Sequence, residues 1–355
     1  MKIGSHFSEF PPLHEVYKDH FLIGTTSWNS RMTGEKLDII LRHFNAFTPE
    51  NAMKPNQVQR ERDVWTWEEI DSQLAKVEGL KLIGHTLAWH GQTAPWQWDD
   101  PNFDRETAIA NMHHHIETVL GRFGAKLLSM DVVNEAFSDG NADGVADEGG
   151  NPPDWRDKLR KNKGWYLALG AEWVELAFLK AAEVVDRNGW DLKLYYNDFN
   201  MDFENKAQAV YNMARELNEK HAGRRPNGKQ LIEGIGMQGH YNSNTITANV
   251  ERSIELFSSL PGVSVSITEL DINWQNSGSL TDEQSKLQTA MYAELFRIFK
   301  RHAAGLANNG KGRIERVTFW GTNDRDSWRA QGFPLLFDGE LRARANFLAV
   351  LDHGN

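Results

Sequence analysis

Residues 131–135 read Asp-Val-Val-Asn-Glu and residues 267–271 read Ile-Thr-Glu-Leu-Asp, so each stretch carries a glutamate at the end of an apolar, β-branched run. Such a run predicts a buried strand, and a strand that ends in a carboxylate holds an anion at its tip against the cost of desolvation. Glu135 and Glu269 are 134 residues apart (269 − 135). Two such tips predict one cleft with two positioned carboxylates, the minimum equipment for cleaving a glycosidic bond.

Outward from these stretches, short apolar runs alternate with longer helical patterns along the whole chain. In residues 171–188, for example, apolar side chains recur at the 3.6-residue spacing of a helix, and Gly189 follows as a stop signal. Eight strand–helix units predict an α/β protein, a single (β/α)8 barrel that forms one catalytic domain over residues 1–355. We expect strands at 21–25, 46–48, 82–87, 128–133, 192–196, 234–238, 263–269 and 316–320, and helices at 35–43, 67–78, 105–121, 171–188, 205–221, 248–260 and 282–303.

Composition excludes several classes of function. The 355 residues are 40% hydrophobic, which suffices for a large packed core. The net charge is -10 with both signs mixed, so nucleic acid is not an expected partner. The apolar runs are strand-sized, which argues against a membrane span, and without cysteine there is no disulfide framework. Residues 1–21 lack a hydrophobic signal core, so we expect a cytoplasmic protein, or a secreted one if the chain is a processed form.

In a (β/α)8 barrel, the chemistry gathers at the carboxyl ends of the strands. Polar residues recur at the predicted strand ends of this chain, and several of the thirteen tryptophans have polar neighbours, as sugar-stacking platforms do. A single polar residue at a strand end can be purely structural, but polar residues at most of the strand ends predict a functional site. The rim holds Glu50, Asn51 and Lys54, then His85, Trp89 and Gln92, then Asn134 and Glu135, Asn197 and Asp198, Gln238 and His240, Glu269 and Asp271, and Trp320.

With these residues in view, the chain resembles the family 10 glycoside hydrolases, which are retaining endo-β-1,4-xylanases. The resemblance extends over nearly the whole chain, roughly residues 13–352. Each motif alone is weak, but their order and their places on the predicted strand ends are specific. The matching segments are 48–54, 84–92, 131–135, 196–200, 236–240, 267–271, 319–321 and 327–328.

The resemblance implies a catalytic group. Glu135 would be the general acid/base and Glu269 the nucleophile that forms a covalent glycosyl-enzyme, with the two carboxyls about 5–5.5 Å apart. Asn134 would bind the sugar 2-hydroxyl. His240 would hydrogen-bond the nucleophile, and Asp271 would orient the imidazole of His240.

The resemblance also implies a substrate-binding cleft. On the residues alone, Glu50 and Lys54 could equally be a solvated i, i+4 pair. Gln238 would face the nucleophile or the 2-hydroxyl. Phe199 stands where the family usually has tyrosine, so one hydrogen bond on the leaving-group side is in doubt. The expected substrate-binding residues are Glu50, Asn51 and Lys54 on the non-reducing side, His85, Trp89 and Gln92 along the cleft, Phe199 and Gln238, and an aromatic wall of Trp320 and Trp328.

Two finer expectations concern the third and fourth strands. Members of the family carry a non-proline cis peptide at the corresponding position, which implies one at His85-Thr86. By strand alternation Asp131 points into the barrel, where a buried carboxylate needs a partner. We therefore expect a hydrogen bond between Asp131 and His85, which a bulge before Glu135 would undo.

The long loop 138–163 follows strand four and resembles the start of a calcium loop. The closing glutamate is missing, with Gly150 in its place, so an acidic surface loop is the favoured interpretation. If calcium binds, its ligands would be Asp139, Asn141, Asp143 and Asp147. The adjacent histidines 113–115 diverge on a helix and do not predict a metal site, and no cofactor is expected.

The function predicted is a retaining endo-1,4-β-xylanase that acts on xylan or xylo-oligosaccharides by double displacement, with no protein partner. The missing signal segment favours short oligosaccharides. Two alternatives stay open: the same barrel acting on cello-oligosaccharides or aryl-glycosides, and a non-catalytic sugar-binding barrel.

Overall fold

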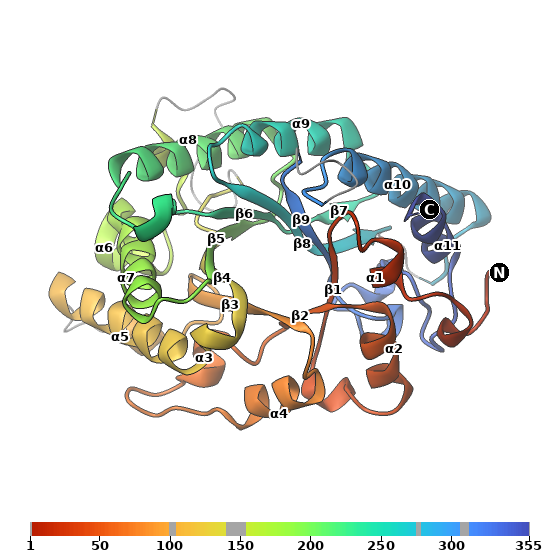
Figure 1. Cartoon of the computed structure of the whole chain (residues 1–355), viewed down its shortest axis with the longest axis horizontal. Coiled ribbons are helices and arrows are strands. Elements are labelled where there is room, and N and C mark those ends of the chain that lie inside the picture. The colour runs from red at the N-terminus through yellow and green to blue at the C-terminus, as the bar shows by residue number, and fades with distance from the viewer. Residues whose placement is uncertain (1, 99–103, 140–153, 275–277, 306–311, 355) are drawn as a thin grey trace.

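The computed structural model describes residues 2–98, 104–139, 154–274, 278–305 and 312–354. It confirms the (β/α)8 barrel. Parallel strands form a closed ring in the order β1-β2-β3-β4-β5-β6-β8-β9, and helices surround the ring (Figure 1). The strands are β1 (Leu22–Ser27), β2 (Ala46–Pro49), β3 (Lys81–Trp89), β4 (Leu127–Asn134), β5 (Lys193–Asp198), β6 (Gly234–Met237), β7 (His240–Asn242), β8 (Ser264–Asn273) and β9 (Ile314–Phe319).

Helices follow the strands in the alternation that the sequence predicts. α7 illustrates the match, because its buried residues include the periodic apolar set and Gly189 ends it with a φ of 65°. None of the described helices is both long enough and apolar enough to cross a lipid bilayer. The helices are α1 (Leu13–Val16), α2 (Glu35–His43), α3 (Pro55–Val58), α4 (Glu68–Lys76), α5 (Arg105–Phe123), α6 (Trp165–Leu169), α7 (Trp173–Asn188), α8 (Glu204–Lys220), α9 (Thr247–Ser258), α10 (Asp282–Arg301) and α11 (Ala345–Gly354).

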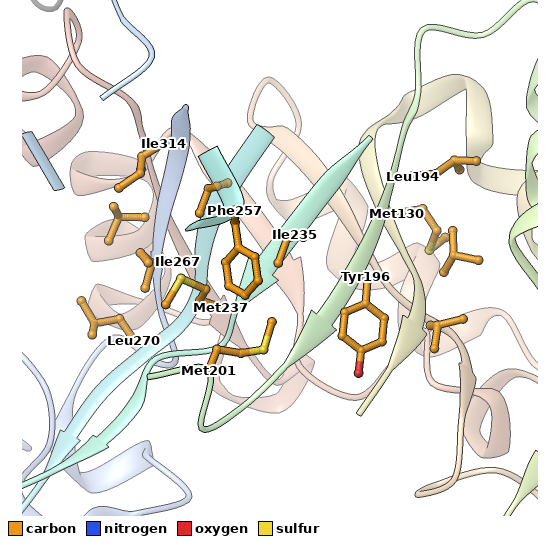
Figure 2. Close-up of a cluster of buried hydrophobic side chains, with 14 of the residues drawn as sticks. Met130, Leu194, Tyr196, Met201, Ile235, Met237, Phe257, Ile267, Leu270 and Ile314 are labelled. Carbon is orange, nitrogen blue, oxygen red and sulfur yellow. The ribbon is translucent and has the colours of Figure 1, made fainter. Parts of the chain in front are cut away.

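The strands are buried because both of their faces are covered. In β8, every residue except the last is buried. Figure 2 shows side chains of β4, β5, β6, β8 and β9 gathered with Phe257 of α9 in one apolar cluster. This core joins the barrel to the helical layer and fixes the directions of the strands, and therefore the positions of their carboxyl ends.

The sixth strand differs from the expected single segment 234–238. β6 ends at Met237, the chain turns at Gly239, and β7 begins at His240. Gly239 has a φ of 81°, and a Cβ there would lie 2.9 Å from Cγ2 of Ile267. A glycine is thus required both by the backbone conformation and by the close approach of β8. The turn sets β7 beside the end of β8, with His240 opposite Asp271.

Candidate active site

The carboxyl ends of the barrel strands open into a cleft with a cavity volume of about 590 Å³, a size typical of small-ligand sites. The cleft gathers the predicted site residues, apart from Asp271, which is fully buried next to His240. The predicted residues that line it are Glu50, Asn51, Lys54, His85, Trp89, Gln92, Asn134, Glu135, Phe199, Gln238, His240, Glu269, Trp320 and Trp328.

Glu269, on β8, is buried and held from two sides. Nδ2 of Asn197 donates to Oε1 of Glu269 at 2.8 Å, and Nε2 of His240 lies 3.1 Å from Oε2. Burial alone raises the pKa of the Glu269 carboxyl, but the hydrogen bond from His240 and the charges of His85 and His240 lower it by more than burial raises it. The net pKa is below the ordinary glutamate value, so Glu269 is an anion at neutral pH.

His240 lies between two carboxylates. Its Nδ1 is 3.0 Å from Oδ2 of Asp271, and its Nε2 faces Glu269. Burial alone lowers the pKa of the imidazole, whereas the charge and hydrogen bond of Asp271, helped by Glu269, raise it to about 9. A protonated His240 carries an N–H on each ring nitrogen, lies between the two carboxylates and keeps a positive charge beside Glu269.

Glu135, directly after β4, is half-buried and points both carboxyl oxygens at donors. Nε2 of Gln238 donates to Oε1 at 2.9 Å, and Nε1 of Trp89 donates to Oε2 at 2.8 Å. The backbone of Glu135 has a φ of 54°, a strained conformation for a residue with a side chain. Its amide nitrogen donates to the carbonyl of Asn197 at 2.9 Å and so holds it there.

Of the two alternatives expected for Gln238, the structure does not bear out a side-chain contact with the nucleophile, and the contact with the sugar 2-hydroxyl stays a prediction. Its side chain bonds Glu135 and Asn134 rather than Glu269, although its backbone carbonyl accepts from the amide of Glu269 at 2.6 Å. The position of Gln238 at the end of its strand fixes its height in the barrel, but its side-chain rotamer determines which glutamate it bonds. Its amide is thus part of the Glu135 side of the cleft.

Amide side chains link the two glutamates. Oδ1 of Asn134 accepts from Nδ2 of Asn197 at 3.0 Å and from Nε2 of Gln238 at 3.3 Å. Asn197 also reaches Glu269, while Gln238 also reaches Glu135. One hydrogen-bonded network therefore fixes both carboxylates relative to each other.

Lys54, Asn51 and Gln92 form a second polar group at the ends of β2 and β3. Nζ of Lys54 donates to Oδ1 of Asn51 and to Oε1 of Gln92, both at 2.8 Å, and lies 5.0 Å from the ring centroid of Trp89. Both Glu50 and Lys54 are buried, so the alternative of a solvated pair is wrong. Burial raises the pKa of the Glu50 carboxyl and lowers the pKa of the Lys54 ammonium.

Two expectations for His85 are confirmed, its hydrogen bond to Asp131 and the cis peptide, while its contact with substrate stays a prediction. Nδ1 of His85 lies 2.8 Å from Oδ2 of Asp131, both side chains are buried, and the peptide bond between His85 and Thr86 is cis. The pairing of β4 with β5 shifts register between Asp131 and Val133, but the shift leaves the hydrogen bond in place. His85 also meets Trp320 edge to face, with ring centroids 5.5 Å apart.

The aromatic wall has a buried and an exposed part. Trp320 is buried, whereas Trp328 is 59% exposed. Nε1 of Trp328 donates to Oδ2 of Asp271 at 2.8 Å, and its ring packs on His240 with a centroid distance of 5.0 Å. Arg329 donates to Oδ1 of Asp271 at 3.0 Å. The wall is thus bonded to the carboxylate that holds His240.

Several lining residues were not predicted. Trp28, Asn200, Asn242 and Arg329 line the cleft, and Asn197 touches Glu269 without being assigned to the site. Asn197 stood in the predicted rim of polar strand ends, so its place carried a signal. Trp28 and Arg329 lie outside the regular strands, where no periodicity marks them.

The candidate calcium ligands lie mostly beyond the described residues, because Asn141, Asp143 and Asp147 belong to the segment 140–153. Asp139 is described, and its Oδ1 lies 2.8 Å from Nζ of Lys206. Its Oδ2 lies 3.6 Å from Arg160. Protein cations therefore already neutralise Asp139.

The consecutive histidines of α5 point in different directions, as the helical pattern predicts. Nδ1 of His115 lies 2.9 Å from Oε1 of Gln59 in the buried interior. His114 is half-exposed and lies 3.8 Å from Asp63.

Comparison with known proteins places the chain among glycosidases. The family model described as Glycosyl hydrolase family 10 matches residues 12–353. Endo-1,4-beta-xylanase A of Thermotoga maritima is 34% identical over an alignment that covers 97% of this chain and 31% of that protein. Endo-1,4-beta-xylanase A of Caldicellulosiruptor saccharolyticus is 32% identical over 92% of this chain and 91% of its own length. This chain thus spans about a third of the first relative and most of the second.

A solved structure agrees with these relatives. The intracellular xylanase TsXylA of Thermoanaerobacterium saccharolyticum JW/SL-YS485, in a mutant complex with xylotetraose, has a TM-score of 0.81 to this chain at 31% identity. The match covers 96% of this chain and 98% of that one.

Proposed function

The chain belongs to glycosyl hydrolase family 10, and we propose that it is a retaining endo-1,4-β-xylanase with Glu269 as nucleophile and Glu135 as acid/base. The observation that carries the proposal is the amide network through Asn134, Asn197 and Gln238. It ties two carboxylates from different strands to one cleft, one buried and anionic, the other half-buried. That pairing suits double displacement.

In the first step, an oxygen of ionised Glu269 attacks the anomeric carbon while the bond to the leaving oxygen breaks. Glu135 gives its proton to that oxygen, and a covalent glycosyl-enzyme remains. In the second step, water gives a proton to Glu135 and its oxygen displaces Glu269 from the anomeric carbon. The charge of His240 stabilises Glu269 both before attack and after release.

The remaining polar groups suit a xylose chain. Lys54, Asn51 and Gln92 already exchange hydrogen bonds, so they offer sugar hydroxyls a charged, pre-arranged partner. Trp320 and Trp328 supply apolar faces for the rings. The names of the relatives support xylan or xylo-oligosaccharides as the substrate. We also propose that residues 1–355 act as one catalytic domain on short xylo-oligosaccharides within the cell, which the likeness to the intracellular xylanase TsXylA supports.

The test is product analysis on xylan, xylotetraose and cellotetraose, with the anomeric configuration followed by NMR. We expect xylo-oligosaccharide products that first appear as the β-anomer, and little release from cellotetraose. Products that first appear as the α-anomer would contradict double displacement. Preferential cleavage of cellotetraose would instead support a cello-oligosaccharide enzyme.

Variants separate the roles of the two glutamates. Glu269→Ala and Glu135→Ala should each lower turnover of xylotetraose by at least about 10³-fold. With an activated aryl xylobioside, azide should restore Glu135→Ala to give the β-azide, and Glu269→Ala to give the α-azide. Glu219→Ala, at an exposed position of α8, is the matched control. Unchanged turnover in Glu269→Ala would contradict the role of Glu269 as nucleophile, whereas binding without hydrolysis by the intact chain would favour a sugar-binding barrel.

A further inference from the structure

A buried ionic group lies beside the cleft, formed by Asp139, Arg160, Asp198 and Lys206. We refer to it as the Lys206 cluster. Nζ of Lys206 lies 2.8 Å from Oδ1 of Asp198 and 2.8 Å from Oδ1 of Asp139, and Arg160 lies 3.6 Å from Asp139. The side chain of Lys206 is 4% exposed and that of Asp198 is fully buried. Two anions and two cations thus balance at a depth where an unpaired charge would be costly.

The Lys206 cluster holds the backbone on both sides of the cleft edge. Oδ1 of Asp198 accepts from the amide of Phe199 at 2.9 Å, and its Oδ2 accepts from the amide of Phe137 at 3.4 Å. Arg160 donates to the carbonyl of Phe137 at 3.1 Å. Phe137 comes two residues after Glu135, so the cluster joins the end of β5 to the chain that leaves Glu135.

Lys206 also contacts a ring that lines the cleft. Its Nζ lies 4.1 Å from the ring centroid of Phe199. A desolvated ammonium over an aromatic face is attracted by the negative face of the ring. Because the same ammonium is fixed by two carboxylates, it holds the ring in one place.

Phe199 lies on the side of the cleft where the leaving group departs. It follows β5, the neighbour of β4, and Glu135 comes directly after β4. Lys54 and its partners lie at β2 and β3, on the other flank of β4. If Glu135 protonates the leaving oxygen, the sugar that departs extends toward β5. This assignment rests on the proposed function.

We propose that Lys206 is a positioning residue: by fixing the ring of Phe199 it strengthens the binding of the departing sugar. Lys206 itself touches no substrate. Its effect should therefore appear only with leaving groups long enough to reach Phe199.

The test compares two substrates with the same glycone. Cleavage of xylotetraose at its middle bond releases a disaccharide from a xylobiosyl glycone, whereas β-xylobiosyl fluoride loses a single atom that cannot reach Phe199. We expect Lys206→Met to lower the ratio of kcat/KM for xylotetraose to that for the fluoride by about tenfold. In a Phe199→Ala background, which lowers the same ratio, adding Lys206→Met should change it by less than about twofold.

Lys180→Met is the matched control. Lys180, on α7, is also buried and paired with two carboxylates, Glu117 at 2.8 Å and Glu183 at 3.1 Å, but it lies outside the cleft. It should leave the ratio within about twofold of wild type. If Lys206→Met does not fold, Asp139→Asn removes one of the two anions of Lys206 and should lower the ratio by about threefold.

Each outcome decides between a positioning role and its alternatives. A preserved ratio in a folded Lys206→Met protein, or in Asp139→Asn, would overturn the positioning role. An equal loss on both substrates would also overturn it, because Lys206 would then act on the fold as a whole. A further loss of the ratio when Lys206→Met is added to Phe199→Ala would overturn it too, because Lys206 would then act on the acid Glu135, which a fluoride leaving group hardly needs. A wild-type protein that hydrolyses neither substrate would contradict the proposed function itself, before any variant is compared.

Discussion

Replacing Asp271 with asparagine should remove most of the pH dependence that His240 gives to the stability of the barrel. Asp271 is buried, lies 3.0 Å from Nδ1 of His240, and is the main cause of the raised pKa of about 9. In the unfolded chain, a histidine titrates near about 6.5. A histidine with a higher pKa in the folded state stabilises it fully below pH 6.5, and this stabilisation is lost as the pH rises through 9.

The magnitude follows from the two pKa values of His240. The pKa rise, worth about 1.4 kcal/mol per unit, corresponds to about 3 kcal/mol of unfolding free energy between pH 6.5 and pH 9.5. Asparagine keeps the shape of Asp271 but not its charge, while burial still lowers the pKa of the imidazole. The pH-dependent part should therefore shrink to about 1 kcal/mol or less.

The assay is urea unfolding of wild type, Asp271→Asn and His240→Asn at several pH values from 6.5 to 9.5. The other titrating groups are common to the three proteins, so the difference between curves isolates His240. The two variants should lie closer to wild type at pH 9.5 than at pH 6.5. If the gap between wild type and Asp271→Asn is the same at every pH, Asp271 does not hold a proton on His240 and the reasoning is refuted.

Three further predictions concern the frame of the site. Asp131→Leu leaves His85 buried without its partner and should cost about 3 kcal/mol in urea unfolding; a loss below about 1 kcal/mol would show that the pair contributes little. Gly239→Ala adds a Cβ that would lie 2.9 Å from Ile267, at a positive φ, and should cost about 2 kcal/mol, seen as a lower Tm by calorimetry; an unchanged Tm would contradict the account of the turn. Because protein cations already pair with Asp139, a chelator should leave the Tm within about 1 °C, whereas a rise in Tm with added calcium would point to a real site.

Much of the fold could be predicted because its signals are local. Apolar runs buried on two faces marked the strands, and helical periodicity marked the helices, to within a few residues. The parallel arrangement then brought polar strand ends to one rim, so most of the cleft followed from position alone.

What could not be predicted depends on contacts between distant residues. Gln238 was placed at the right strand end, but which glutamate it bonds is a rotamer choice set by its neighbours. The break between β6 and β7 comes from one left-handed glycine that the period-2 pattern does not reveal. Arg329 and Trp28 lie in irregular segments, where only the folded chain brings them to the cleft.

At Glu135, the left-handed backbone makes thermal stability and catalytic activity favour different residue types. Glycine and asparagine adopt a φ of 54° at a lower conformational cost than glutamate does. Selection for thermal stability alone would therefore favour those residues, and the acid/base carboxyl would be lost. A library screened only for melting temperature should yield stabilised but inactive variants at this position. Residue 135 should therefore be left unchanged when the enzyme is engineered for stability.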